Sequence, residues 1–268
     1  MTGRIKYYLT RLQLVGVISA VRQQLWLTKR RVRKTDYLIA KAYFAQHDIP
    51  KLHLGCGDHL LEGWLNADLF PRANAVLHLD ATKILPFQDN TFDYIFSEHM
   101  IEHVTYRKGT AMLAECYRVL KNNGIIRVAT PDLQFLIDLY RKDKTELQMK
   151  YIEYATDTFI TGAPYYDEAF VINNFVRDWG HLFIYDKKTL RASMERAGFT
   201  NIIDCELNES AHDALRHLAN EERLPEGYLR LETFVLEGTK LSAGEQVQSI
   251  GSSARVAESP AHGLDLAP

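Results

Sequence analysis

The sequence predicts an α/β fold in which a largely parallel sheet is covered by helices. Short apolar segments alternate with helical patterns between residues 51 and 240. This alternation is typical of parallel strands joined by helical crossovers. Ligands of such sheets bind beyond the carboxyl ends of the strands, so a functional site is expected there. The predicted strands are residues 51–54, 65–68, 76–80, 92–97, 125–130, 200–206 and 231–237.

The clearest predicted helix lies between the fourth and fifth strands. Its apolar side chains are spaced three and four positions apart, which is the helical period. We expect it to end at Asn122-Asn123-Gly124, because glycine adopts the left-handed conformation that closes many helices. The apolar positions are Leu113, Cys116, Tyr117 and Leu120.

Composition and charge exclude several classes of protein. With 268 residues, of which 46% are hydrophobic and 25% charged, the chain is typical of a soluble globular protein. The first 35 residues carry nine Lys/Arg and no Asp/Glu, which leaves 23 basic against 34 acidic side chains in the rest. An acidic body is a poor partner for nucleic acid. Three widely spaced cysteines favour reduced thiols and a cytoplasmic location.

Three regions are expected: a basic helical arm (1–50), a main domain (51–240) with a cap insertion at about 132–185, and a disordered tail (241–268). The arm could pack on the domain, or it could lie on anionic lipid at the inner face of the membrane, and both interpretations stay open. Its longest charge-free apolar run has ten residues, too few to span a bilayer. Its apolar positions at helical spacing are Leu14, Val17, Ile18, Val21 and Leu25.

Polar groups that suit a nucleoside follow the first three strands. Gly55 and Gly57 allow the backbone to turn sharply and approach a ligand, and Asp68 ends the next strand, where it could accept both ribose hydroxyls. Asp80-Ala81 follows the third strand and could meet an adenine amine. No Gly-Lys-Ser/Thr loop is present, and the third glycine of a dinucleotide fingerprint is missing. A phosphate-free adenosine ligand, S-adenosylmethionine, fits best.

At these residues the chain resembles the class I S-adenosylmethionine-dependent methyltransferases, over about residues 51–240. The resemblance implies a Rossmann-like seven-stranded mixed sheet with helices on both faces, a helical cap insertion, and S-adenosylmethionine as cofactor. The segments GWLNAD (63–68) and Pro131-Asp132-Leu133 resemble the branch associated with glycan assembly. The other segments that carry the resemblance are LHLGCG (52–57), LPFQDNTFDYIFSEH (85–99), ECYRVLKNNG (115–124) and LRASMERAGF (190–199).

The resemblance also assigns roles to residues. The Gly55-Cys56-Gly57 turn would wrap the methionine portion, Asp68 would bind the ribose, and Asp80-Ala81 would flank the adenine. The family's third glycine position is His59 here, which leaves open how the methionine carboxylate is held. The methionine end near the sulfonium would be lined by Ser97 and Glu98.

The acceptor is expected to be a hydroxyl of a small molecule or glycan precursor. An amine is the less favoured acceptor. A hydroxyl needs a base, and histidine titrates in the useful range. The candidates are His181, His99 and Asp132, with His103 nearby. Aromatic side chains in the cap insertion would suit such an acceptor.

Two other functions stay open. One is a catalytically silent, S-adenosylmethionine-binding partner subunit. The other is a zinc hydrolase, because His99-Met100-Ile101-Glu102-His103 matches the H-x-x-E-H pattern of inverted zinc peptidases. The position of this pattern after the fourth strand is the one that the methyltransferase resemblance also expects. No metal is therefore expected.

Overall fold

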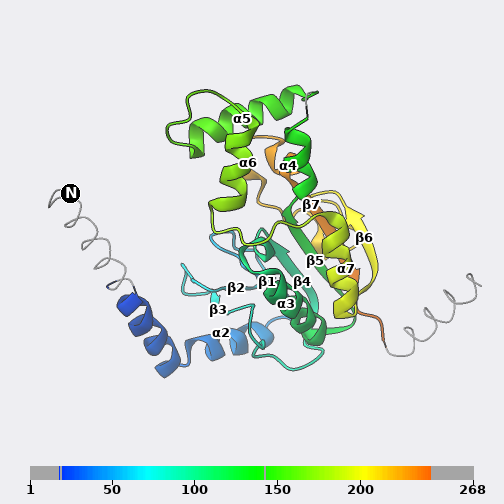
Figure 1. Cartoon of the computed structure of the whole chain (residues 1–268). Coiled ribbons are helices and arrows are strands. Elements are labelled where there is room, and N and C mark those ends of the chain that lie inside the picture. Colours follow the sequence, from blue (N-terminus) through cyan, green and yellow to red (C-terminus); the bar gives the residue numbers. More distant parts are fainter. Residues whose placement is uncertain (1–17, 19, 142, 243–268) are drawn as a thin grey trace, which may run out of the picture.

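A single seven-stranded sheet lies at the centre of the computed structural model, which describes residues 18, 20–141 and 143–242 (Figure 1). The strand order is β3-β2-β1-β4-β5-β7-β6. Pairing is parallel from β3 through β5, whereas β7 is antiparallel to both β5 and β6, so the predicted mixed sheet is confirmed. The strands are β1 (Lys51–Leu54), β2 (Leu65–Asp68), β3 (Leu77–His78), β4 (Phe92–Glu98), β5 (Leu120–Pro131), β6 (Thr200–Cys205) and β7 (Thr233–Thr239).

Helices α3 and α7 pack against one face of the sheet (Figure 1). Met112 and Leu113 of α3 and Leu190 of α7 join Leu52 and Ile126 of the sheet in the largest apolar cluster. Burial of this kind stabilises by about 25 cal/mol per Å² of apolar surface. The helices are α2 (Thr35–Phe44), α3 (Tyr106–Val119), α4 (Leu133–Leu139), α5 (Glu146–Phe159), α6 (Glu168–Arg177), α7 (Lys187–Ala197) and α8 (Tyr228–Glu232), with short 3-10 turns η1 (Ile101–His103), η2 (Asp213–Leu215) and η3 (Glu221–Arg223).

The opposite face of the sheet is covered by the segment that carries η2 and by the loop before β2. Leu215 and Leu218 pack there against Phe96 of β4 and Trp64. Arg127 of β5 is fully buried on this side, pairs with Glu237 of β7, and donates to the carbonyls of residues 206, 207 and 209. A buried guanidinium is stable only with such partners, so the covering segment is fixed in place.

The junction between α3 and β5 differs from the sequence prediction. The helix ends at Val119, and Leu120 already pairs with Phe92 of β4. Asn123 has a φ of 64°, so the Asn-Asn-Gly segment forms an irregular start to the strand instead of a helix cap. The reason is long-range: Leu120 is buried in the sheet core, and the amide of Asn123 donates to the carbonyl of Lys240. The later helix α7 does end at a glycine, because Gly198 caps it with a φ of 108°.

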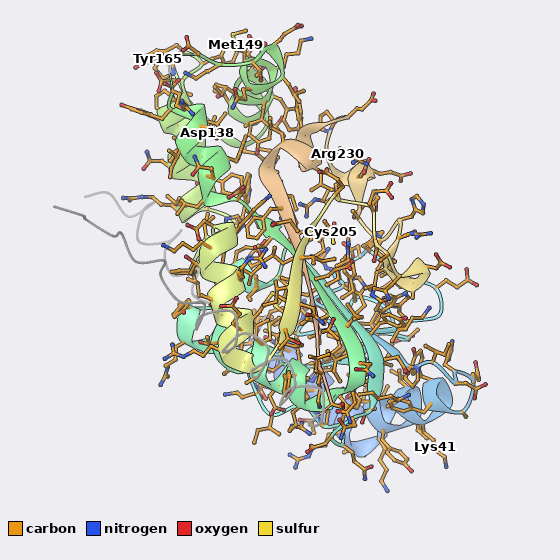
Figure 2. All side chains as sticks on the ribbon, turned by 90° about the vertical axis from the view of Figure 1, so that its right-hand side faces the viewer. Lys41, Asp138, Met149, Tyr165, Cys205 and Arg230 are labelled. Carbon is orange, nitrogen blue, oxygen red and sulfur yellow. The ribbon has the colours of Figure 1, made fainter. Side chains whose placement is uncertain are left out.

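Helices α4, α5, α6 and α8 form a cap beyond the carboxyl ends of the strands, with an apolar core of its own. In Figure 2, Met149 and Tyr165 lie at the outer end of this cap and Lys41 lies at the opposite end of the molecule. The helical cap expected from the sequence is therefore present. Its core contains Phe135, Leu136, Leu139, Tyr151, Ile152, Ala155, Val171, Phe175 and Tyr228.

Helical residues 20–32 precede α2 and contact the sheet at its β3 edge. The buried side chain of Arg30 pairs with Asp36 and donates to the carbonyl of Val76 at 2.8 Å. Val21 and Leu25 are 52% and 65% exposed, so the described part of the arm does not bury its apolar stripe. Within the described chain no helix is long and apolar enough to cross a bilayer. The predicted tail beyond residue 242 and the arm positions 14 and 17 lie outside the described residues.

Candidate active site

A cavity of about 610 Å³ lies beyond the carboxyl ends of β1, β2 and β3, and we call it the first cavity. Its lining includes five of the residues that the sequence assigned to a cofactor, and it also includes His99, His103 and Trp179. Neighbouring parallel strands end at the same edge, so residues far apart in sequence meet there. The five predicted residues are Gly55, Gly57, Asp68, Asp80 and Ala81.

The turn after β1 needs glycine for two different reasons. The amides of Gly55 and Cys56 both donate to the carbonyl of Ala67, at 2.9 and 3.1 Å, and this holds the turn against β2. A Cβ on Gly55, whose φ is 72°, would lie 2.7 Å from the Cβ of Met100. A Cβ on Gly57, with a φ of 52°, would meet no atom within 4 Å. Gly57 therefore leaves open the space that a ligand would occupy.

Two aspartates offer acceptor oxygens to the first cavity. Asp68 accepts from the amide of Gly57 at 2.9 Å and from the amide of Phe70 at 2.7 Å, so its carboxylate is fixed with lone pairs left over. Asp80 accepts from the amide and the hydroxyl of Thr82. Burial raises the pKa of Asp80, but the Thr82 hydrogen bonds and nearby lysines outweigh burial, and the net pKa is lowered. Both groups suit the hydroxyls and amine of an adenosine.

The other predicted cofactor residues do not line the first cavity. Burial raises the pKa of the Cys56 thiol to about 12, so this thiol is unreactive. Ser97 is buried, and its hydroxyl has no hydrogen-bond partner within the described chain. The carboxylate of Glu98 accepts from the amide of Asn220, on the side of the sheet that carries η2. His59, at the third glycine position, contacts the carbonyl of Leu218 at 3.1 Å. Their contacts with a ligand stay predictions.

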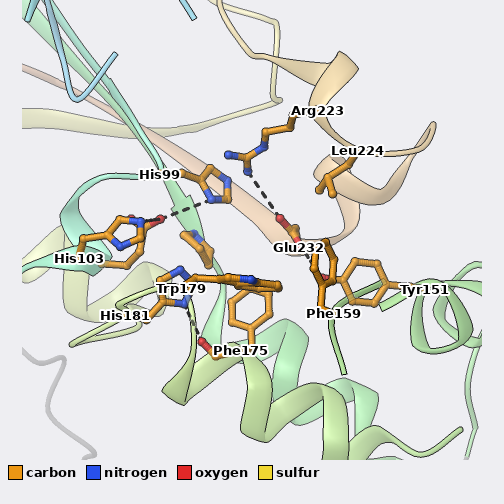
Figure 3. A pocket seen from close by; sticks show the side chains of 12 residues that line it. His99, His103, Tyr151, Phe159, Phe175, Trp179, His181, Arg223, Leu224 and Glu232 are labelled. Atoms are coloured by element: carbon orange, nitrogen blue, oxygen red, sulfur yellow. Dashed lines mark hydrogen bonds and ion pairs between the residues drawn. The ribbon is translucent and has the colours of Figure 1, made fainter. Parts of the chain in front are cut away.

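A second cavity of about 250 Å³ lies between the strand ends and the cap (Figure 3). It shares His99, His103 and Trp179 with the first cavity, so the two cavities meet at these side chains. Its walls come from segments spread over more than 130 positions of the chain. The other lining residues are Glu102, Pro131, Tyr151, Phe159, Phe175, His181, Arg223, Leu224 and Glu232.

His99 and Glu102 form the floor of the second cavity. His99 has a φ of 46°, a strained conformation for a side-chain-bearing residue, and its Nε2 lies 2.7 Å from the hydroxyl of Thr233. Glu102 is fully buried and accepts from Thr130 at 3.1 Å. Burial raises its pKa, but His99 and His103 outweigh that effect and lower the net pKa. The cavity floor is therefore a carboxylate beside imidazoles.

His181 reaches the second cavity from the loop after α6. Its Nδ1 lies 2.6 Å from the carbonyl of Phe175, so Nδ1 carries the donated hydrogen and Nε2 keeps its lone pair. Burial lowers the pKa of His181, which favours the neutral ring. The rings of His103 and His181 are 4.9 Å apart. Asp132 lines neither cavity and instead caps α4 by accepting from the amide of Gln134 at 2.9 Å.

Several side chains of the second cavity were missed by the sequence analysis. Glu232 is buried, accepts a short hydrogen bond from Tyr151, and lies 3.6 Å from Arg223. Burial raises the pKa of Glu232. The sequence placed Glu232 inside a predicted strand, whereas it ends α8, and no local pattern distinguished it. Trp179 belongs to the aromatic residues of the cap insertion, which the sequence analysis considered only as a group, and it lines both cavities.

Comparison with known proteins finds a methyltransferase family model that matches part of the chain. The family model described as "Methyltransferase domain" matches residues 65–128, which run from β2 into β5. An uncharacterized protein of Methanocaldococcus jannaschii is 31% identical over 118 residues, which cover 41% of this chain and 48% of that protein. The chain thus spans about half the length of this relative.

Solved structures of similar proteins include two described as methyltransferases that depend on S-adenosylmethionine. One, from Thermotoga maritima and described as a possible histamine N-methyltransferase, is 18% identical and covers 71% of this chain and 82% of its own, with a TM-score of 0.40. The other, from Archaeoglobus fulgidus, is 15% identical and covers 80% and 99%, with a TM-score of 0.42.

Proposed function

We propose that this protein, which carries a methyltransferase domain, transfers the methyl group of S-adenosylmethionine to a hydroxyl oxygen of a small molecule or a glycan precursor. The domain match and the first cavity support the cofactor. When bound, S-adenosylmethionine supplies an electrophilic methyl sulfonium. The chain then has to align the acceptor oxygen, exclude water and remove a proton. The Gly55–Gly57 turn, Asp68 and Asp80 would hold the cofactor.

The observation that carries this proposal is the histidine–glutamate cluster of His99, Glu102, His103 and His181, at the junction of the two cavities. A hydroxyl that attacks a methyl group must lose its proton, which requires a base or an equivalent group within hydrogen-bond reach. Two of the three base candidates from the sequence, His99 and His181, lie here, and Asp132 does not. Amine acceptors would not require such a cluster.

A small molecule or sugar as acceptor is supported by the walls of the second cavity. Phe159, Phe175 and Trp179 present aromatic faces, while Arg223 and Glu232 offer charged groups at one side. Apolar walls with a few polar groups are typical of small-molecule sites. The rings of Phe159 and Trp179 are 4.9 Å apart and meet edge to face, and aromatic walls of this kind suit a planar acceptor or a sugar.

The test is methyl transfer to a panel of phenols, sugars, sugar nucleotides and amines, followed by mass spectrometry of S-adenosylhomocysteine and product. In His181→Gln we expect turnover of a hydroxyl acceptor to fall by roughly 10²–10⁴-fold, with unchanged affinity for S-adenosylmethionine. His217→Asn is the matched control, because this exposed histidine lines neither cavity and asparagine tolerates its positive φ.

Three outcomes would contradict the proposal. Full turnover in His181→Gln would remove the cluster from the reaction. Methylation of amines alone would exclude a hydroxyl acceptor. Tight cofactor binding without any product across the panel would favour a silent partner subunit.

We also infer that the arm holds the protein on an anionic membrane surface inside the cell. Val21, Leu25 and Val32 are exposed and lie four and seven positions apart, hence on one face of helical residues 20–32. No acidic residue occurs before Asp36, so anionic lipid complements this segment. Cys56, Cys116 and Cys205 are free, which supports a reducing compartment.

Flotation with vesicles tests the arm. The full chain should float with phosphatidylglycerol vesicles and stay unbound with phosphatidylcholine alone. Val21→Glu with Leu25→Glu should abolish flotation, whereas Val176→Glu, an exposed valine on the cap helix α6, should not. Equal flotation of the two variants, or none for the wild type, would overturn the inference.

A further inference from the structure

The histidine–glutamate cluster has the geometry of a metal site. Glu102 and His103 lie on η1, and His181 lies on the loop after α6 (Figure 3). A carboxylate oxygen and two imidazole nitrogens from these residues all lie within 4.8 Å of one another. Among the residues that the structure describes, no other group of three His, Cys, Asp or Glu side chains meets this condition.

One oxygen of Glu102 lacks a hydrogen-bond partner. The side chain is fully buried, and Oε2 accepts from Thr130. Oε1 accepts no hydrogen bond within the described chain, and two imidazole nitrogens lie near it, Nδ1 of His99 at 3.4 Å and Nε2 of His103 at 3.8 Å. A buried carboxylate is stable when it is hydrogen-bonded, paired or bound to a metal ion. An ion beside Oε1 would satisfy the oxygen that the protein leaves open.

His181 has the orientation that metal-binding histidines commonly show. Its Nδ1 donates to the carbonyl of Phe175 at 2.6 Å, which fixes the ring and leaves the Nε2 lone pair free. In Figure 3 the ring lies below His103, with the nitrogen that is not bonded to Phe175 turned toward the cluster. A backbone carbonyl on the far nitrogen is the usual support of a histidine ligand.

We propose that Glu102, His103 and His181 bind a divalent transition-metal ion of the zinc type, whose open positions face the second cavity. Two imidazoles and one carboxylate suit zinc, whereas magnesium and calcium prefer sites made of oxygen alone. The role of the ion rests on the proposed function: it coordinates the acceptor oxygen and thereby makes that oxygen more acidic. The substrate class narrows to molecules with a hydroxyl that can reach a metal, such as phenols and vicinal diols.

The atoms balance in a single displacement. The acceptor O–H bond breaks on the ion, and the proton passes to His99, the histidine of the cluster that the ion does not use. The oxygen then forms a bond to the methyl carbon as the carbon–sulfur bond breaks. The electron pair of that bond stays on sulfur, which leaves S-adenosylhomocysteine and the O-methyl product. His181 therefore acts on the acceptor through the ion.

The experiment uses the full chain without an affinity tag, stripped of metal and titrated with Co²⁺, and then with Zn²⁺ in competition. The wild type should bind one Co²⁺ per chain with visible d–d absorption, and Zn²⁺ should displace it. His181→Gln and Glu102→Gln should weaken binding by more than about 100-fold, since changes around the ligands alone cost roughly 10–100-fold. His217→Asn should bind as the wild type does.

The readouts separate this proposal from the proposed function. Cobalt absorption needs neither cofactor nor acceptor. If the protein binds Co²⁺ in this way but methylates no hydroxyl, the metal site stands and the proposed function is refuted. If the protein methylates hydroxyls equally well after metal stripping and shows no Co²⁺ spectrum, the metal site is refuted and the proposed function stands. If Glu102→Gln fails to fold, the variants of the half-buried His181 and the exposed His103, His181→Gln and His103→Gln, decide, and wild-type Co²⁺ binding in both would overturn the proposal.

Discussion

The two cavities share three side chains, yet they are built in different ways. The first cavity is made at strand ends, where Gly55, Asp68 and Asp80 each follow or end a strand of the sheet. The second cavity is made where the cap packs over the sheet, from segments between His99 and Glu232. Strand ends are fixed by backbone pairing, whereas cap walls depend on side-chain packing. Binding at the first cavity should therefore be sensitive to backbone changes, and binding at the second to side-chain changes.

The largest effect is expected for Gly55→Ala. The new Cβ would lie 2.7 Å from that of Met100, at a φ of 72° that disfavours alanine, so the turn would have to move. We expect binding of S-adenosylmethionine, measured by calorimetry, to be lost, and the melting temperature to fall by several degrees. Gly162→Ala in the cap is the control: its φ is 85°, but its Cβ would meet no atom within 4 Å. Equal losses in both variants would contradict the assignment of the turn.

Gly57→Ala sharpens this prediction, because Gly57 borders open space in the first cavity. Its Cβ meets no protein atom, so the change should reduce cofactor affinity by more than tenfold while the melting temperature changes less than in Gly55→Ala. Thermal melts with and without S-adenosylmethionine measure both quantities. A variant that binds the cofactor as tightly as the wild type would place the ligand elsewhere.

Asp68→Asn should produce the next largest effect. It removes the charge that would accept from the ribose hydroxyls, and hydrogen bonds to charged groups contribute about 1.5–3 kcal/mol, or roughly 10–150-fold in affinity. The side-chain NH₂ group of asparagine must face the backbone amide of either Gly57 or Phe70, so the turn also loses one hydrogen-bond acceptor. Asp213→Asn, with 92% of its side chain exposed, is the calorimetric control. Unchanged affinity in Asp68→Asn would exclude a ribose at this strand end.

Trp179→Ala should distinguish the roles of the two cavities. The indole lines both, but it comes from the cap. We expect KM for the acceptor to rise by about tenfold or more, from the loss of an aromatic wall, while cofactor affinity changes less than threefold. Steady-state kinetics with each substrate varied in turn measure this difference. A larger effect on the cofactor than on the acceptor would reverse the roles assigned to the two cavities.

The smallest effects concern pH, and here the acids of the two cavities should act in opposite directions. The pKa of Asp80 is lowered in the folded protein, so its contribution to stability is present at neutral pH and is lost on acidification through that lowered pKa. The pKa of Glu232 is raised by burial, so its contribution is present below the ordinary glutamate value and is lost as the pH rises. Asp80→Asn should have a lower melting temperature than the wild type at neutral pH. The melting temperature of Glu232→Gln should rise relative to that of the wild type as the pH rises. Melting curves between pH 3 and 8 test both signs.

The same division explains what the sequence could predict. The positions of the strands along the chain, the Gly55–Gly57 turn and the two aspartates follow from local patterns, because the turn and the aspartates lie within a few residues of a strand end. The early end of α3 at Val119 did not follow, since Leu120 is drawn into the sheet by Phe92 and Lys240. The second cavity was foreseen only as single histidines. The side chains of His181 and Glu232 are oriented by their contacts with Phe175 and Tyr151, and no spacing along the chain reveals these contacts.

The backbone carbonyl of Glu102 accepts hydrogen bonds from the amides of Leu182 and Phe183, where the chain returns from the cap to the sheet. The segment that leads from the cap back to the sheet is therefore held by the same residue whose carboxylate lies in the cluster. A movement of the cap away from the sheet would strain or break these two hydrogen bonds. The position of the cap and the position of the cluster are thus coupled through one residue, Glu102.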